Sequence, residues 1–272
     1  MTNLALLPQR GVLRLTGADR ISFLNGLVSN DVAKAAPGHA VWAALLTPQG
    51  KYLSDFFILT TDEALLLDVP RADIPRLLTK LRRYRLRAQV ELEDASETYA
   101  VYAAWDGTPT GATIAAPDPR LPEAGWRLIS PTPLPANATE ADYTAHRIAL
   151  GLPDGAPDLE PEKTLLLEAG FDELHGIAWD KGCYMGQELT ARTKYRGLVK
   201  RRLLPVELEA PAPAPATGTP VTAEGQEVGD IRSSAGNIAL AMLRVDALEK
   251  TLVAGETTLH PRIPVWAHGI GR

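Results

Sequence analysis

A hairpin near the start of the chain limits the folds that this sequence can adopt. Residues 41–46 and 51–60 are rich in apolar side chains, and the turn Thr47-Pro48-Gln49-Gly50 separates them. This pattern predicts two adjacent antiparallel strands. Strands are also expected at residues 11–15, 64–69, 87–93, 99–104 and 126–129, and helices at residues 20–27, 70–84 and 141–150. Because helices and hairpins mix along the chain, an α+β fold is favoured over a doubly wound parallel sheet.

The sequence pattern changes near residue 201. From there short strands alternate with turns, beginning with an expected strand at residues 203–208. This spacing is typical of a small all-β module. We therefore expect two domains, an α+β region over residues 1–200 and a β domain over residues 201–272.

Composition restricts the environment and the partners of the chain. Hydrophobic residues make up 45%, and 28 basic against 33 acidic residues give a net charge of −5, so direct nucleic-acid binding is not expected. One cysteine excludes an internal disulfide, which indicates a reducing compartment. No signal peptide is recognisable, and no apolar run reaches the ~20 residues of a membrane helix. We expect a cytoplasmic protein that does not contact membranes and, since no dimerisation device is visible, a monomer.

The single cysteine lies in the most unusual segment of the chain. The octapeptide from Lys181 to Glu188 reads KGCYMGQE, and its two glycines make it a poor helix and a poor strand. A thiol reacts as thiolate, which positive surroundings stabilise, and Lys181 and several following basic residues could provide them. Cys183 is therefore either a reactive or metal-directed thiol, or a buried cysteine that acts as a small apolar residue.

The number of cysteines limits what Cys183 can do. Iron–sulfur clusters are usually held by four thiolates, so this chain cannot hold one alone. A partner or a small thiol would have to supply the other ligands. The five histidines show no metal-ligand spacing, and no resident metal site is expected.

Two carboxylates are further candidates. Glu168 follows an apolar run and precedes Ala169-Gly170. At the end of a buried strand it could accept two hydrogen bonds from a planar amidine-like edge, such as the aminopyrimidine of a pterin, or it could be a surface or capping residue. Asp55 could be a general base in a cleft, although strand alternation favours an outward position. A basic stretch over residues 76–87 is either a solvated helix face or an anion site.

The octapeptide, with Ala191-Arg192 and Tyr195-Arg196-Gly197, resembles the signature of the YgfZ-like folate-binding proteins of iron–sulfur cluster assembly. These are relatives of the aminomethyltransferase of the glycine-cleavage system. Further segments are similar to sequences of these groups and extend the resemblance to nearly the whole chain: residues 17–32, 46–51, 164–170, 229–234 and 238–241.

This resemblance implies a fold and a ligand. The fold would be two ferredoxin-like folate-binding subdomains around a central cleft, followed by a small C-terminal β-barrel. The ligand would be tetrahydrofolate or a derivative, with Glu168 on the pterin edge. Among the basic residues, Arg82, Arg83, Arg192 and Arg196 are candidates for the glutamate tail of the folate. Cys183, with Lys181 beside it, resembles the residue on which the cluster-related activity depends.

The leading hypothesis is a tetrahydrofolate-binding accessory protein for the assembly or repair of iron–sulfur enzymes, including those that modify tRNA. Its partners would be iron–sulfur enzymes or assembly proteins. A folate-dependent aminomethyltransferase or one-carbon demethylase with Asp55 as base is the alternative. The transferases carry two consecutive aspartates where this chain has Ser54-Asp55, which weakens that alternative. A non-enzymatic binding module with an inert Cys183 is a third possibility.

Overall fold

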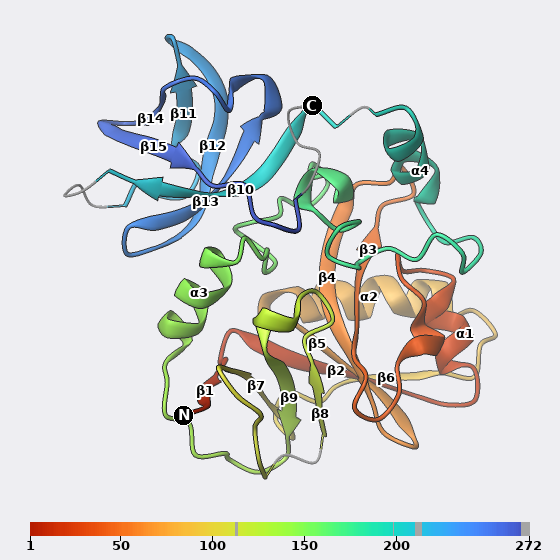
Figure 1. Cartoon of the computed structure of the whole chain (residues 1–272). Coiled ribbons are helices and arrows are strands. Elements are labelled where there is room, and N and C mark those ends of the chain that lie inside the picture. Colours follow the sequence, from red (N-terminus) through yellow and green to blue (C-terminus); the bar gives the residue numbers. More distant parts are fainter. Residues whose placement is uncertain (112–113, 198, 210–213, 268–272) are drawn as a thin grey trace.

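The computed structural model describes residues 1–111, 114–197, 199–209 and 214–267 (Figure 1). Within these residues the chain forms two antiparallel sheets and a closed barrel. The barrel strands are, in order around the barrel, β10 (Arg201–Leu208), β13 (Ile238–Arg244), β12 (Gln226–Ala235), β11 (Pro220–Ala223), β14 (Leu252–Ala254) and β15 (Thr257–Pro261). The predicted α+β architecture with a small C-terminal β-barrel is confirmed.

The larger sheet contains the hairpin that the sequence predicted. Its strand order is β3 (Val41–Leu46), β4 (Tyr52–Thr60), β5 (Ala64–Pro70), β2 (Arg10–Thr16) and β6 (Glu91–Asp94). One face of this sheet packs against α1 (Arg20–Asn25) and α2 (Ile74–Arg85). The turn between β5 and α2 is a short 3-10 helix, η2 (Arg71–Asp73).

The smaller sheet has the order β1 (Asn3–Leu6), β7 (Ala100–Trp105), β9 (Trp126–Ser130) and β8 (Ile114–Pro117). The helix α3 (Glu140–Ala149) follows it and lies between this sheet and the barrel (Figure 1). A long connection then carries the 3-10 helix η4 (Leu166–Ala169) and α4 (Gln187–Tyr195) before β10 begins. Three single-turn 3-10 helices complete the chain: η1 (Val32–Lys34), η3 (Pro122–Ala124) and η5 (Val245–Ala247).

One continuous core joins the three parts. It contains Trp42 and Phe57 from the larger sheet, Tyr143 from α3, and Leu203 and Met242 from the barrel. A division into separate domains at residues 200 and 201 stays a prediction, although the first barrel strand does begin at Arg201.

Several elements differ from the sequence predictions. β6 begins at Glu91 rather than at residue 87, and the segment before Gly170, expected as the end of a buried strand, forms η4 instead. The short strands β1 and β8 were not predicted. In the described residues no helix is both long and apolar enough to cross a bilayer.

A bulge in β4 changes which side chains share a face. Leu45 pairs with Ser54 but Leu46 pairs with Tyr52, so Leu53 is an extra residue. A bulge shifts the alternation of the following residues by one position. Tyr52 and Asp55 therefore lie on the same face of the sheet, although they are three positions apart and a regular strand would put them on opposite faces.

Candidate functional site

The octapeptide is mostly loop, and its last two residues begin a helix. Residues 181–186 form an irregular loop, and α4 begins at Gln187. Gly182 and Gly186 both have positive φ, at 90° and 80°, which glycine adopts without strain. Cys183 is exposed at the surface. The loop thus presents the single thiol to solvent, and the alternative of a buried apolar cysteine does not hold in this structure.

Lys181 anchors this loop to the N-terminal region. Its Nζ donates to three backbone oxygens, those of Asn25 at 2.5 Å, Val28 at 2.7 Å and Asn30 at 2.8 Å. These bonds use all three N–H donors of the ammonium group. Burial lowers the pKa of Lys181 to about 8, although the charge of Asp31 acts in the opposite direction. The geometry therefore gives Lys181 a positioning task; a direct effect on the thiol stays a prediction.

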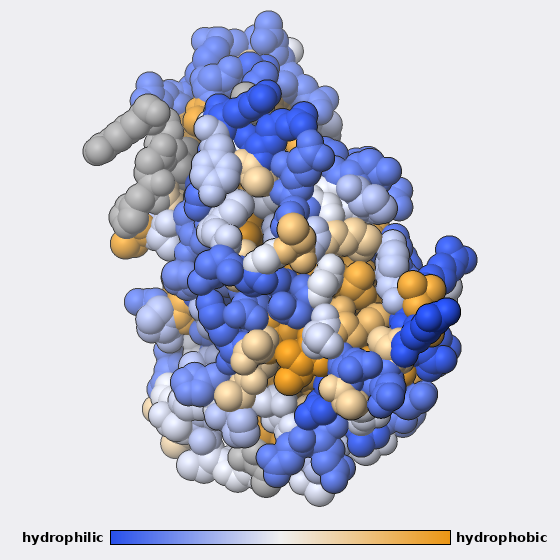
Figure 2. Space-filling view, turned by 90° about the vertical axis from the view of Figure 1, so that its right-hand side faces the viewer, coloured by the Kyte–Doolittle hydropathy of each residue, from blue (hydrophilic) through white to orange (hydrophobic). Residues whose placement is uncertain are grey.

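Arg192 and Arg196 lie on α4 and at its end, where they line a groove beside the cysteine loop. The groove has a volume of about 560 Å³, and Gly182 and Tyr184, the neighbours of Cys183, also line it. Figure 2 views the side of the molecule on which α1 and α4 lie in Figure 1, and it shows hydrophobic side chains exposed among hydrophilic ones there. Four of the expected site residues, Cys183, Lys181, Arg192 and Arg196, are thus on one segment of the structure.

Glu168 lies on η4, which packs beside α4. Its carboxylate is half-buried, and burial raises its pKa, an effect that Arg201 and Lys51 partly offset. Among the residues that the structure describes, no side chain forms a hydrogen bond or ion pair with this carboxylate. Glu168 does not line the groove beside Cys183.

Asp55 is completely buried in β4. Trp42 Nε1 donates to its Oδ2 at 2.9 Å, and the Tyr52 hydroxyl donates to its Oδ1 at 2.8 Å. Burial raises the pKa of this carboxyl, and the nearby charge of Arg10 counteracts the rise. The outward position favoured by strand alternation is wrong, because both faces of β4 are covered by other parts of the chain.

A buried pair of arginines was not predicted from the sequence. The guanidinium groups of Arg120 and Arg127 are almost fully buried and lie over the Phe57 ring, at 4.8 Å and 4.1 Å from its centroid. Arg120 pairs with Asp118 at 2.7 Å, and Arg127 lies 3.3 Å from Asp68. Phe57 and Asp68 are far from both arginines in the sequence, so no local motif could have identified this arrangement.

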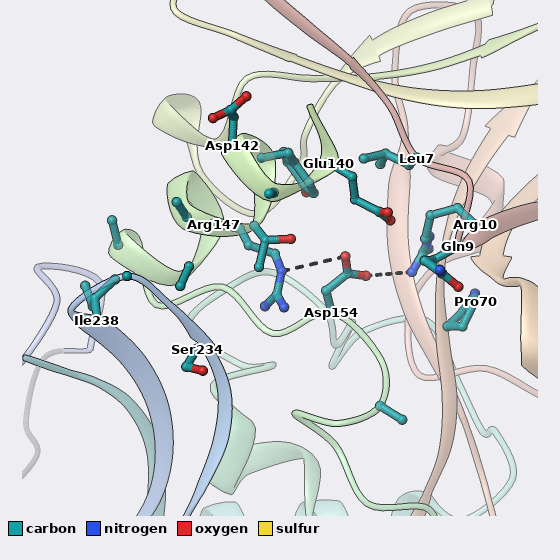
Figure 3. A pocket seen from close by; sticks show the side chains of 18 of the residues that line it. Leu7, Gln9, Arg10, Pro70, Glu140, Asp142, Arg147, Asp154, Ser234 and Ile238 are labelled. Atoms are coloured by element: carbon teal, nitrogen blue, oxygen red, sulfur yellow. Dashed lines mark hydrogen bonds and ion pairs between the residues drawn. The ribbon is translucent and has the colours of Figure 1, made fainter. Parts of the chain in front are cut away.

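A second, larger cavity lies where the larger sheet, α3 and the barrel meet (Figure 3). Its volume is about 1160 Å³. Figure 3 shows Asp154 between Arg10 and Arg147, and the nearest N–O distances are 2.6 Å and 3.8 Å. Although burial acts to raise it, the surrounding arginine charges hold the pKa of Asp154 well below its usual range. None of the site residues expected from the sequence lines this cavity.

No three His, Cys, Asp or Glu side chains of the described residues are grouped as a metal site. The exposed thiol is therefore not part of a ligand set formed by this chain alone within those residues. Any cluster held at Cys183 would need further ligands from outside.

The fold and the barrel together define a class of protein. The overall structure is similar to the glycine cleavage system aminomethyltransferase T from Bartonella henselae, with a TM-score of 0.74, 13% identity, and coverage of 99% of this chain and 87% of that one. Residues 200–269 match the family described as the CAF17 C-terminal beta-barrel domain. The chain thus has the aminomethyltransferase fold and ends in a CAF17-type barrel.

Curated relatives place the chain within that class. The iron–sulfur cluster assembly factor IBA57 homologue of Mycosarcoma maydis is 32% identical, over 97% of this chain and 84% of the relative. Human IBA57 is 31% identical, over 94% of this chain and 83% of the relative. Mouse IBA57 is 32% identical, over 89% of this chain and 78% of the relative. The chain belongs to the IBA57 family of iron–sulfur cluster assembly factors. The expected relation to iron–sulfur cluster assembly factors is confirmed, and these curated relatives are of the IBA57 form.

The expected cytoplasmic localisation is contradicted by these relatives. All three are named as mitochondrial proteins, which points to the mitochondrion rather than the cytoplasm. The expectation used the lack of disulfides and of a recognisable signal peptide. A reducing environment does not identify one compartment, so that reasoning could not distinguish the two.

Proposed function

We propose that this protein supports the assembly or repair of iron–sulfur enzymes and that Cys183 is its functional thiol. The observation that carries the proposal is the exposed position of the only cysteine, on a loop fixed by three hydrogen bonds from Lys181. A loop built this way keeps the thiol accessible and at a defined place. The IBA57 relatives, which are named as assembly factors, support the same function.

Iron–sulfur assembly proteins or their client enzymes are the proposed partners. A single thiol can supply only one of the several ligands that a cluster requires. The remaining ligands then come from the partner, and the cluster is cargo rather than a resident group. The proposal also includes three finer points. The client enzymes include some that modify tRNA, the protein is related to the YgfZ-like branch, and it is a monomer.

Tetrahydrofolate is the proposed small-molecule ligand. The aminomethyltransferase-like fold supports it. The surroundings of Glu168 fit a pterin edge, because the carboxylate is half-buried and no described side chain donates to it. A planar donor edge would supply hydrogen bonds that this carboxylate otherwise lacks, beside the one from the backbone N–H of Leu165. When bound, the folate would provide a carrier for one-carbon units.

The glutamate tail of the folate is assigned to Arg192 and Arg196 only as a prediction. These arginines line a groove that Glu168 does not line. A transferase with Asp55 as base is not favoured by the geometry. The Asp55 carboxylate has no solvent-accessible surface and already accepts hydrogen bonds from Trp42 and Tyr52.

The function is tested by restoring iron–sulfur enzyme activity in cells that lack this protein. We expect the wild-type chain to restore it and Cys183→Ala to fail, while enzymes without clusters stay unaffected. Because Cys183 is exposed, the variant should unfold at the wild-type temperature. Full activity of Cys183→Ala together with loss of activity in Asp55→Ala would contradict the proposal and support the transferase.

Folate binding is tested separately by calorimetric titration of the purified protein with tetrahydrofolate. We expect binding by the wild type and a loss of about tenfold or more in Glu168→Ala, since a bidentate carboxylate contact is removed. Glu162→Ala, at an exposed glutamate of the same connection, is the matched control. No binding by the wild type would remove folate from the proposal and leave the function of Cys183 to be judged alone.

A further inference from the structure

The groove beside Cys183 has the dimensions of a small-molecule site. It runs between the segment 178–184 and α4, and its volume of about 560 Å³ is in the usual range for ligand pockets. Gly182 and Tyr184 both line it, so Cys183 lies at its edge. The exposed thiol and the groove therefore form one surface.

Tyr184 places an unused donor in this groove. The side chain is 8% exposed, and no hydrogen bond of normal geometry joins its hydroxyl to any described residue, its neighbour Thr190 included. Burial raises the pKa of Tyr184 to about 12, so the hydroxyl keeps its proton near neutral pH. A buried hydroxyl without a partner is unfavourable. The hydroxyl oxygen is itself buried, so an acceptor atom of a bound molecule would satisfy it once the Tyr184 side chain turns toward the groove.

Two arginines give the groove a preference for anions. Arg192 forms an exposed ion pair with Glu188 on the same helix, whereas Arg196 forms no ion pair with any described residue. Guanidinium groups bind carboxylates through paired hydrogen bonds. The Tyr184 hydroxyl and Arg196 are thus donors without acceptors in one groove, next to a thiol.

Trp179 and Tyr195 form an aromatic wall of the groove, and contacts with Lys194 and Asp172 fix the position of Trp179. Trp179 and Tyr195 meet edge to face at 6.2 Å between centroids. Lys194 Nζ lies 4.2 Å from the Trp179 ring centroid and pairs with Asp172 at 2.8 Å, and Trp179 Nε1 donates to the same Asp172 carboxylate at 2.7 Å. These contacts fix the wall before any ligand binds. A rigid wall lowers the entropic cost of binding.

We propose that this groove binds a low-molecular-weight anionic thiol, such as a small peptide thiol with free carboxylates. Its carboxylates would pair with Arg196, Arg192 and the Tyr184 hydroxyl, in place of a folate glutamate tail, and its sulfur would lie beside Cys183. The inference rests on the proposed function, because it names the source of a second thiolate at the Cys183 site. Each thiolate would donate a lone pair to the iron of a delivered cluster, and the two thiol protons would pass to solvent.

The binding experiment uses reduced glutathione as the probe. The full-length protein is titrated calorimetrically without oxygen against glutathione, S-methylglutathione and cysteamine, a thiol without carboxylates. We expect the first two to bind at millimolar concentration and cysteamine not to bind. Arg196→Gln and Tyr184→Phe should each weaken glutathione by about tenfold, because each removes a hydrogen bond to a carboxylate. Arg87→Gln, at an exposed arginine far along the chain, is the matched control.

A second measurement tests whether the sulfur of the bound thiol lies beside Cys183. Oxidised glutathione is added, and the Cys183 thiolate attacks one of its sulfurs to form the Cys183–glutathione disulfide and release one glutathione thiolate. We expect this exchange to be at least about tenfold faster than with uncharged hydroxyethyl disulfide, and the preference to vanish in Arg196→Gln. Mass spectrometry follows both rates.

Any one of three outcomes would overturn the inference. The wild type does not bind glutathione, or both Arg196→Gln and Tyr184→Phe bind it as tightly as the wild type, or the two disulfides exchange at equal rates. Binding of an acidic peptide but not of glutathione would assign the groove to a protein partner instead. In each case the loss of enzyme activity in Cys183→Ala would still support the proposed function, so the two failures are distinguishable.

Discussion

Gly50, in the turn between β3 and β4, and Gly186, just before α4, are in direct backbone contact. A Cβ added to Gly50 would lie 2.7 Å from the Gly186 carbonyl oxygen, and one added to Gly186 would lie 3.0 Å from Cα of Gly50. Neither position therefore has room for a side chain. The cysteine loop thus packs directly against the turn of the hairpin predicted from residues 41–60.

We predict that Gly186→Ala destabilises the protein by about 2–4 kcal/mol, because its Cβ would lie 2.5 Å from the Thr47 carbonyl oxygen and φ is positive. Gly182→Ala is the matched control. It shares the positive φ but has no atom within 4 Å of the new Cβ, so only the backbone cost of roughly 1–2 kcal/mol is expected. Urea denaturation measures both, and equal losses would show that the glycine contact does not contribute.

We predict that Lys181→Met destabilises the folded protein by about 1–3 kcal/mol, since three partly buried carbonyls lose their donor. Urea denaturation at neutral pH measures this loss. Lys34→Met, at an exposed lysine, is the control and should change the free energy of unfolding little. An unchanged stability of Lys181→Met would contradict the positioning role of Lys181.

The lowered pKa of Lys181 makes the stability of the folded protein depend on pH. This pKa is lowered from 10.5 to about 8 in the folded chain. Between these values the unfolded chain binds more protons, so the free energy of unfolding of the wild type should rise with pH relative to Lys181→Met. Denaturation at about pH 7.5 and pH 10 tests the sign, and NMR of the Lys181 side chain tests the titration near pH 8. A relative fall in wild-type stability would contradict it.

The sequence predicted the elements whose patterns are local. The hairpin at residues 41–60 and the change at residue 201 follow from apolar alternation and turn residues, and both are present. The octapeptide was recognisable because Gly182 and Gly186 disfavour regular structure, yet α4 starts inside it. Its glycines predicted the loop, and only the packing against Gly50 determines where that loop lies.

The interior of the site could not be predicted in the same way. Asp55 receives hydrogen bonds from Tyr52 because the extra residue Leu53 shifts the alternation of β4, and a bulge has no reliable local signal. Arg120 and Arg127 are buried although arginine is ordinarily exposed. Both stack on Phe57, and Arg127 also lies near Asp68; these partners are distant in sequence, so only the tertiary structure reveals the burial.

We predict that Asp55→Asn becomes more stable relative to the wild type as the pH rises. The pKa of Asp55 is raised above 3.8, mainly by burial, so the folded wild type holds this proton more tightly than the unfolded chain. Its contribution to stability is lost as the pH rises from 3.8 through the folded pKa, whereas Asn cannot ionise. Denaturation at about pH 4 and pH 7 measures the difference. The opposite trend would show that hydrogen bonds to the carboxylate outweigh its burial.

The junction between α3 and the barrel gives the last prediction. Asp158 accepts from Arg147 Nη1 at 2.6 Å, and from the backbone N–H and hydroxyl of Ser233 at 3.1 Å and 2.5 Å. Asp158→Ala would leave the buried Arg147 guanidinium without its shortest ion pair and should cost about 3–5 kcal/mol. Asp246→Ala, at the exposed pair with Arg244, is the control and should have no measurable effect.

The same variant tests whether the barrel unfolds with the rest of the chain. The shared core of Tyr143, Leu203 and Met242 predicts one cooperative transition in the wild type. With Asp158 removed, α3 keeps one hydrogen bond from Arg147 to the Ser233 hydroxyl but loses the links through Asp158. Tryptophan fluorescence and far-UV circular dichroism should then no longer give coincident urea transitions. Coincident transitions in Asp158→Ala would show that the shared apolar core alone is enough to couple the barrel to the rest of the chain.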